Sequence, residues 1–267
     1  MTIATSMETV VLADAAALAV ESADRSCVIL GAAIERAGEA HVALTGGSSA
    51  VGLYRELVAP RWSGAVDWSR LHLWWGDERF VPLDHPLSNA GLAARMLLEA
   101  GLDDQIDTSG ALPVPASNVH PMPIDEAIAA AAGPDWAAER HEGAVRARIG
   151  RRQDHIPVFD LVLLGVGPDG HLLSVFPGSP ALAPDAPLVM GIPAPTHVEP
   201  HVARVTHSPS ILAAADAVLV MVSGTAKADV VARILADDAD SNQLPARLAV
   251  LPNAVWLLDR DSAALLR

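Results

Sequence analysis

The chain has 267 residues, of which 51% are hydrophobic, and a formal net charge of −14. This length and apolar content suffice for one large α/β domain, so we expect residues 1–267 to form a single domain. The excess of acidic residues argues against nucleic acid and against anionic membranes as partners. No apolar run is long enough to predict a membrane span. The single cysteine, Cys27, excludes a disulfide framework, and we expect a cytoplasmic protein that is a monomer or a weak dimer.

Apolar, strand-like runs alternate with helical segments, which predicts an α/β fold with a doubly wound, mostly parallel sheet and helices on both faces. In chain order we expect a helix at 14–38, a strand at 40–45, a helix at 49–58, a strand at 70–75 and helices at 89–99 and 125–150. Strands follow at 159–164, 188–192 and 217–222, then a helix at 226–236 and a strand at 255–258. The helix at 125–150 is expected to break at Gly133-Pro134. The Pro-rich passage 177–200 is expected to be a long ordered loop over the sheet.

Two glycine turns lead from predicted strands into helices. In Thr45-Gly-Gly-Ser-Ser49 the free amides of Gly46, Gly47 and Ser48 suit an anion such as phosphate, although a plain N-cap with turn glycines is the favoured interpretation of this motif taken by itself. Ser223-Gly-Thr-Ala-Lys227 has the same form and ends in Lys227, the only lysine among the 18 basic residues. A cation is unfavourable at a helix start, so we expect an anionic group to offset it.

A third strand end carries acids and a base together. Trp75-Gly-Asp-Glu-Arg79 places Asp77 and Arg79 where they suit recognition of a hydroxylated ligand, although a surface salt bridge is an equal alternative. Asn89 follows ten residues later and either joins them or only caps its helix.

The fourth strand end is the most informative. The strand at 159–164 is followed by Gly165-Val-Gly-Pro-Asp-Gly-His171, a glycine-rich loop that carries Asp169 and His171. Ligands of parallel sheets bind beyond the carboxyl ends of the strands, where this loop begins. A histidine with an adjacent carboxylate is typical of proton transfer, so we expect an active site here.

Several other chemistries fit poorly. Gly165-x-Gly-x-x-Gly170 matches the dinucleotide fingerprint, but it lies late in the chain and Asp185, the acid that follows, is not at a strand end. No P-loop and no Gly-x-Ser-x-Gly elbow occurs. Arg204 precedes a helix expected at Ser208 and Pro209. The nearby histidines 197, 201 and 207 lack the spacing of metal ligands, so we expect them to be solvated.

Five motifs together resemble the family of glucosamine-6-phosphate isomerases and 6-phosphogluconolactonases, and the lactonase branch in particular. They are Thr-Gly-Gly-Ser-Ser, Trp-Gly-Asp-Glu-Arg with Ser88-Asn89, the run from Gly165 to Pro177, Arg-Val-Thr, and Ser-Gly-x-x-Lys. Their order matches the family over about residues 42–259. Thr45, Leu173 and Val175 depart from the residues common there, and none of these changes removes a polar group.

The resemblance implies hydrolysis of 6-phospho-D-glucono-1,5-lactone, a sugar-phosphate lactone, without a metal or another cofactor. His171 would be the general base and Asp169 its support. The substrate and its phosphate would be bound by Gly46, Gly47, Ser48, Asp77, Arg79, Asn89, Gly170, Arg204 and Lys227. The related amino-sugar phosphate isomerases and deaminases are the nearest alternative, but we expect tyrosine there in place of Arg79. A sugar-phosphate sensor without catalysis would not need Asp169 and His171.

Overall fold

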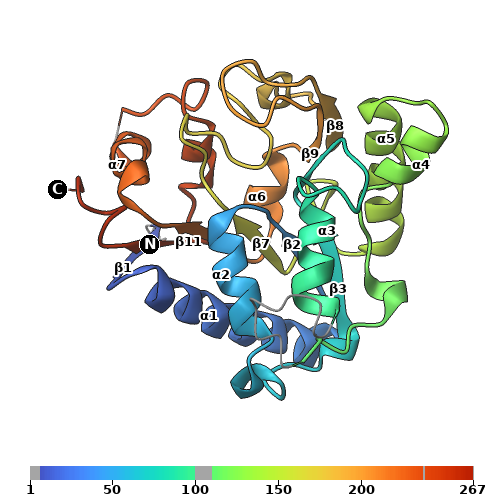
Figure 1. Ribbon diagram of the computed structural model, residues 1–267, viewed down its shortest axis with the longest axis horizontal. Coiled ribbons are helices and arrows are strands. Elements are labelled where there is room, and N and C mark those ends of the chain that lie inside the picture. The colour runs from blue at the N-terminus through green and yellow to red at the C-terminus, as the bar shows by residue number, and fades with distance from the viewer. Residues whose placement is uncertain (1–6, 100–109, 237, 267) are drawn as a thin grey trace.

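The computed structural model describes residues 7–99, 110–236 and 238–266. Its centre is a six-stranded sheet in the order β1-β11-β10-β7-β2-β3, and every neighbouring pair runs parallel (Figure 1). The strands are β1 (Glu8–Leu12), β2 (Ala40–Leu44), β3 (Leu71–Trp75), β7 (Leu161–Leu164), β10 (Val218–Val222) and β11 (Ala254–Asp259). The predicted α/β class is thereby confirmed. The sequence analysis missed β1, a short edge strand whose side chains are largely exposed.

The direction in which the chain winds reverses between β2 and β7. From β2 the chain adds β3 on one side, whereas from β7 it adds β10 and then β11 on the other side. The loops that follow β2 and β7 therefore diverge and leave a crevice at the carboxyl ends of these strands.

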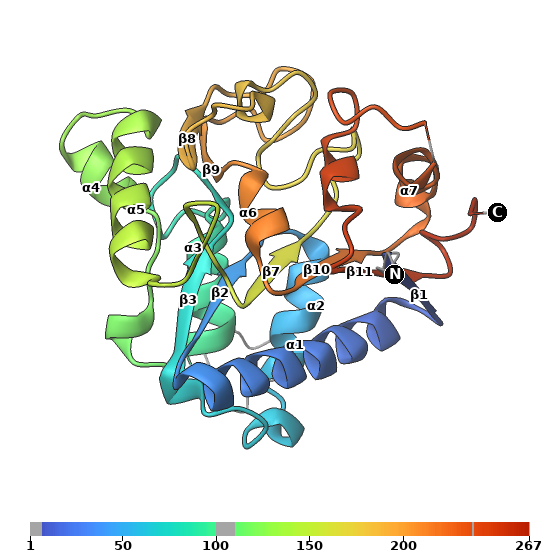
Figure 2. The same cartoon turned by 180° about the vertical axis from the view of Figure 1, so that it is seen from behind.

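Helices cover both faces of the sheet (Figure 2). Leu161 and Leu163 of β7 pack into a core with the helices of one face, whereas Val162 and Leu164 pack into the core on the other face. The first face holds α1 (Ala15–Ala37), α2 (Ser48–Leu57) and α3 (Asn89–Ala93), which continues into a π-helical turn at Ala94–Leu98. The second face holds α4 (Ile124–Ala129), α5 (Pro134–Arg148), α6 (Ser210–Ala214) and α7 (Ala228–Leu235). Because both faces are covered, β7 is apolar along its length.

The predicted break in the helix at 125–150 is confirmed. Gly133 precedes α5 and Pro134 is its first residue, where the missing proline N–H breaks no helical hydrogen bond. No helix in the described part of the chain combines the length and the apolar character needed to cross a bilayer.

A second, antiparallel sheet lies beside the carboxyl ends of the first. It contains β4 (Asp77–Arg79), β9 (Arg204–His207) and β8 (Val189–Ile192), in that order. Only β8 was predicted, because β4 and β9 are short and polar and have no apolar run. A hairpin of β5 (Arg152–Gln153) and β6 (Ile156–Pro157) was missed for the same reason. The second sheet places Arg79 directly opposite Arg204.

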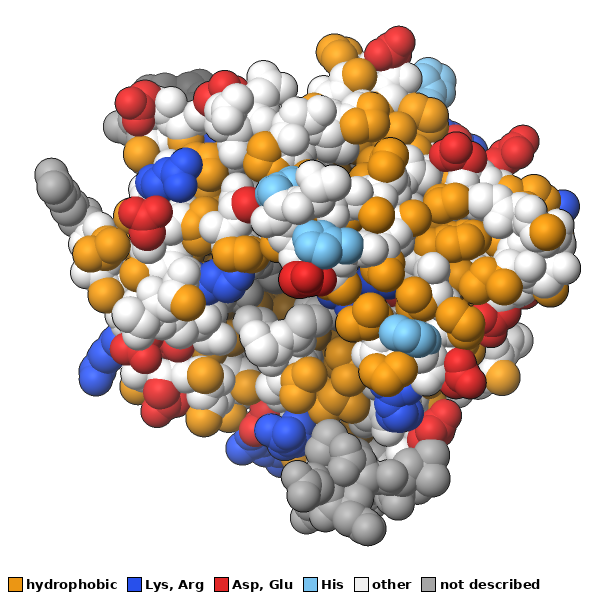
Figure 3. All heavy atoms as spheres, turned by 45° about the horizontal axis from the view of Figure 1, so that its top comes forward, with side chains coloured by type: hydrophobic (Ala, Val, Ile, Leu, Met, Phe, Trp, Pro, Cys, Tyr) orange, Lys and Arg blue, Asp and Glu red, His pale blue; other side chains and the backbone are white. Residues whose placement is uncertain are grey.

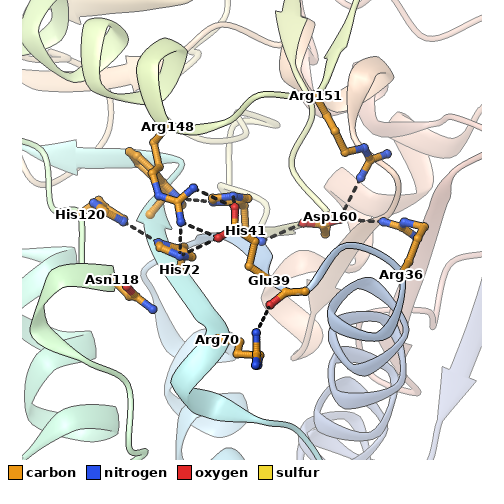
Figure 4. A network of polar contacts seen from close by, with 12 residues as sticks. Arg36, Glu39, His41, Arg70, His72, Asn118, His120, Arg148, Arg151 and Asp160 are labelled. Atoms are coloured by element: carbon orange, nitrogen blue, oxygen red, sulfur yellow. Dashed lines mark hydrogen bonds and ion pairs between the residues drawn. The ribbon is translucent and has the colours of Figure 1, made fainter.

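The amino ends of β2 and β3 carry a compact polar network (Figure 4). Arg148 donates to both carboxylate oxygens of Glu39, over 2.8 and 2.5 Å. The rings of His41 and His72 lie 4.8 Å apart, and His72 Nδ1 is 2.9 Å from His120 Nε2. Three histidines and an ion pair thus occupy the edge of the sheet opposite the crevice.

Candidate active site

A cavity of about 570 Å³ lies at the carboxyl ends of β2, β3, β7 and β10. The space-filling view shows a hollow near the centre of this face, where histidine, acidic and basic side chains meet (Figure 3). The residues that line the cavity include Gly46, Gly47, Ser48, Asp77, Arg79, Asn89, His171, Arg204 and Lys227. The fold therefore brings together residues from four strand ends that are far apart in the sequence. Asp169 and Gly170 are not among the lining residues.

Asp169 and His171 form a pair in the loop after β7. Asp169 Oδ1 lies 2.5 Å from His171 Nδ1 and also accepts the backbone N–H of His171 over 3.2 Å. Because Nδ1 is used by the carboxylate, Nε2 is the ring nitrogen that remains for a ligand. An imidazole held by a carboxylate in this way is the arrangement that a general base requires.

The Asp169 carboxylate is ionised. Burial raises its pKa, but the hydrogen bonds from His171 and then from His197 outweigh burial and leave the pKa well below the usual range of an aspartate. An ionised carboxylate at this position stabilises a positive charge on the His171 ring.

Glycines shape the loop around His171. A Cβ at Gly167 would lie 2.0 Å from His171 Nδ1, so only glycine admits the ring here. Gly170 has a φ of 83°, in the left-handed region that favours glycine, and its backbone oxygen accepts from Ala246. Gly170, predicted to contact the substrate, is not among the residues that line the cavity, and a Cβ at this position would lie 2.6 Å from Leu244 Cδ2.

Arg79 and Arg204 lie side by side on β4 and β9 and line the cavity. Arg204 is only 4% exposed and donates to the backbone oxygens of Val202 and Pro200. Burial lowers its pKa, the negative charge of Asp77 opposes this, and the positive charge of Arg79 adds to it. Within the described residues, Arg79 Nε has no hydrogen-bond partner. Two adjacent guanidinium groups with unused donors suit a planar or phosphate anion.

Lys227 reaches the cavity from the start of α7. Its Nζ donates to the backbone oxygen of Val166 over 2.8 Å. Burial lowers the pKa of the amine and the charge of Asp169 opposes that shift. We expected an anionic group to offset the lysine, but the hydrogen-bond partner in the structure is a neutral carbonyl. Two of the three ammonium donors remain for a ligand.

The start of α2 offers backbone donors to the same cavity. Gly47 precedes the helix and provides no side-chain cap, so the N–H groups of the first turn are not satisfied by a side chain. A glycine at the N-cap position agrees with the alternative of a plain helix start, and the same free N–H groups also suit an anion.

Buried acids hold the third strand end in place. Glu78 accepts the backbone N–H groups of Asn89 and Ala90 over 2.8 and 2.7 Å, and Asn89 donates to the Asp77 backbone oxygen over 3.0 Å. Asp77 and Glu78 are 5% and 2% exposed, so the alternative of a surface salt bridge is wrong. Glu78 was not singled out from the sequence, because nothing local predicts that it caps a helix that begins eleven residues later.

The expectation that histidines 197, 201 and 207 are solvated is confirmed for His197 and His201, whose side chains are 48% and 49% exposed, and is wrong for His207. His197 Nε2 lies 2.9 Å from Asp169 Oδ2, and His197 lines the cavity. His201 Nδ1 lies 2.7 Å from the Pro195 backbone oxygen, and His207 is completely buried on β9. Sequence reasoning missed His197 because its partner is 28 residues away and the intervening loop has no regular period.

Known proteins share both the sequence and the fold. The model of the family "Glucosamine-6-phosphate isomerases/6-phosphogluconolactonase" matches residues 13–257. A 6-phosphogluconolactonase of Synechocystis is 35% identical over 242 residues, which cover 88% of each chain. One of Mycobacterium tuberculosis is 36% identical over 241 residues, again 88% of each.

Solved structures of 6-phosphogluconolactonases and of a related deaminase are similar to this chain in fold. A 6-phosphogluconolactonase from Trypanosoma cruzi superposes with a TM-score of 0.84 at 26% identity, over 99% of this chain and 98% of that one. A monomeric glucosamine-6-phosphate deaminase shares the fold, with a TM-score of 0.72 at 18% identity over 97% of this chain and all of its own. The chain belongs to the family of glucosamine-6-phosphate isomerases and 6-phosphogluconolactonases.

Proposed function

We propose that this protein hydrolyses 6-phospho-D-glucono-1,5-lactone to 6-phospho-D-gluconate, the second step of the oxidative pentose phosphate pathway. The observation that carries the proposal is the Asp169–His171 pair at the edge of a cavity lined by Arg79, Arg204 and Lys227. The relatives named 6-phosphogluconolactonase, which are 35% and 36% identical over most of the chain, support the choice of substrate.

His171 is the general base in this mechanism. Its Nε2 takes a proton from a water molecule while the water oxygen bonds to C1 of the lactone, and the C1 carbonyl oxygen becomes negative. Asp169 stabilises the imidazolium that forms and keeps the remaining proton on Nδ1. The distance of 2.5 Å between Asp169 Oδ1 and His171 Nδ1 supports this role.

The second half of the reaction returns the proton. The bond between C1 and the ring oxygen breaks as the carbonyl re-forms, and His171 donates its proton to the ring oxygen, which becomes the C5 hydroxyl of the product. The new carboxylic acid then ionises and releases one proton to solution. No covalent enzyme intermediate is needed, because a lactone is already a reactive ester.

The cations bind the negative charges of the substrate. Arg79 and Arg204 hold the phosphate or the developing oxyanion, and Lys227 and the Gly46–Ser48 amides provide further phosphate contacts. Asp77 and Asn89 are suited to the sugar hydroxyls, because they offer acceptors and a donor on the same wall of the cavity. The chain as a whole has a net charge of −14. Three cations gathered at one cavity of such a chain indicate that this cavity binds an anionic substrate.

An assay with two substrates tests the proposal. The purified protein is incubated with freshly prepared 6-phosphogluconolactone and, separately, with glucosamine 6-phosphate, and the release of acid and of ammonia is followed. We expect acid release well above the spontaneous rate of an enzyme-free blank, and no ammonia. Ammonia without acid would instead identify a deaminase, and binding of either sugar phosphate without turnover would identify a sensor.

Two further expectations belong to this proposal. We propose the cytoplasm as the compartment, in keeping with a pathway step on soluble sugar phosphates and with the unpaired, buried Cys27. We also propose that the protein acts as a monomer or a weak dimer.

A further inference from the structure

The Asp169 carboxylate is shared by two histidines, and the proposed mechanism uses only one of them. We propose that His197 is a positioning residue for lactone hydrolysis, which holds Asp169 in the orientation that fixes His171. The inference rests on the proposed function, because it assigns His197 a part in the same reaction. His197 comes from the loop between β8 and β9, whereas Asp169 and His171 belong to the loop after β7.

Each oxygen of Asp169 has its own imidazole. Oδ1 contacts His171 Nδ1 over 2.5 Å, and Oδ2 contacts His197 Nε2 over 2.9 Å. The terminal torsion of an aspartate is broad, so a carboxylate held through one oxygen alone rotates readily. A second contact on the other oxygen restricts that rotation and, with it, the orientation of His171.

The two imidazoles pack against the same aromatic ring. Phe176 lies 4.7 Å from the ring of His171 and meets the ring of His197 edge-on at 5.7 Å, with an interplanar angle of 87°. Phe176 is only 5% exposed. The ring therefore acts as a fixed surface that orients both histidines toward the carboxylate between them.

The hydrogen bond from His197 also determines where the proton of the pair resides. A donor on Oδ2 stabilises the ionised carboxylate and makes Asp169 a weaker base. The shared proton then stays on His171 Nδ1, and Nε2 keeps the lone pair that accepts a proton from water. Without His197, we expect a population of His171 rings in the wrong orientation or tautomer.

Steady-state kinetics of three variants of the full chain test this role. His197→Ala is expected to lower kcat about 10-fold to 100-fold with little change in KM, because small misplacements of a catalytic group have effects of this size. His197→Gln is expected to restore most of the activity, since its side-chain amide can donate from nearly the position of Nε2. His201→Ala is the matched control, because His201 lies on the same loop and contacts Glu199 and Pro195. We expect its kcat to be that of the wild type.

A double-mutant cycle and NMR separate positioning from a merely structural role. In an Asp169→Asn background, His197→Ala is expected to cause no further loss of kcat, because its effect passes through the carboxylate. The ¹⁵N signals of the His171 ring are expected to show a protonated Nδ1 in the wild type and a mixture of tautomers in His197→Ala. Thermal melts check that each variant is folded.

Two results would overturn the inference: a His197→Ala variant with wild-type kcat and an unchanged His171 spectrum, or an equal loss of kcat with and without Asp169. The NMR measurement needs no substrate. If the protein failed to hydrolyse the lactone, the spectrum would still decide whether His197 orients Asp169 and His171, so failure of the proposed function and failure of this inference are distinguishable.

Discussion

The two ends of the central sheet combine the same kinds of side chain and differ in what those side chains can do. At the carboxyl ends, His171 and His197 share the Asp169 carboxylate beside a cavity. At the amino ends, His41 and His72 lie near the Glu39 carboxylate, over 3.4 and 3.5 Å. Both regions contain histidines within reach of an acid, and the first of them lies beside the cavity.

The two regions differ in the residue that binds the carboxylate: an arginine binds Glu39, whereas histidines bind Asp169. Arg148 donates to both oxygens of Glu39, and this hydrogen bonding lowers the Glu39 pKa to about 2 even though burial opposes it. The charge of Glu39 is therefore already neutralised, and burial lowers the pKa of His41 to about 4. Asp169, in contrast, receives its hydrogen bonds from histidines and from no arginine within the described residues. A carboxylate without an arginine is free to stabilise an imidazolium, which is what catalysis needs.

Replacing one histidine by alanine at each end of the sheet gives the largest expected difference in kcat and in stability. His171→Ala is expected to lower kcat by about 10³-fold, because general base catalysis is lost, with little change in the free energy of unfolding. His72→Ala is expected to do the reverse: it removes the partner of His120 and Arg148 and costs about 1–3 kcal/mol of stability, with kcat per folded molecule retained. Kinetics and urea unfolding of both variants are the measurements. Full activity of His171→Ala would remove His171 from the mechanism.

A substitution that retains both catalytic side chains but displaces one of them sharpens the contrast. Gly167→Ala puts a Cβ where the His171 ring now lies, so we expect the ring to move and kcat to fall about 10²-fold. Gly143→Ala is the control, because a Cβ there meets no atom within 4 Å and α5 lies away from the cavity. Equal kcat values in the two variants would show that the position of the His171 ring does not limit the reaction.

Acid should destabilise the folded protein through the buried side chain of His207. Burial lowers the pKa of His207 from 6.5 to about 3, so below pH 6.5 the unfolded chain binds a proton that the folded chain excludes. Stability is thus complete above pH 6.5 and falls as the pH decreases toward 3, by about 1.4 kcal/mol per pH unit for this residue. At pH 5 we expect His207→Leu to recover about 2 kcal/mol of that loss. Chemical unfolding at pH 5 and at pH 7.5 is the measurement, and an equal pH dependence in wild type and variant would contradict the effect.

Charge removal at the cavity is expected to have the smallest effect. Lys227→Ala removes one cation of the proposed phosphate site, and we expect KM to rise about tenfold with a smaller change in kcat. The salt dependence of KM should decrease in the variant, because fewer charges bind the substrate. An unchanged KM would contradict the phosphate role of Lys227.

The sequence allowed much of the site to be predicted, because the signals are local. Apolar runs locate β2, β3, β7 and β10, and the polar residues after each run lie at the same edge of a parallel sheet. Asp169 and His171 are two residues apart, so their pairing follows from the loop itself. The short strands β4 and β9 were missed, since three or four residues with few apolar side chains carry no period.

The amino-acid sequence by itself determined the fold class, the glycine turns and the residues that meet at the crevice, because strand order and turn chemistry are encoded within short segments. Only the tertiary structure decided which residues meet across long separations: Arg79 lies opposite Arg204, Glu78 binds the start of α3, and His197 contacts Asp169. It also decided which histidines have a lowered pKa, such as His41 and His207, since burial depends on packing between elements that no local pattern describes.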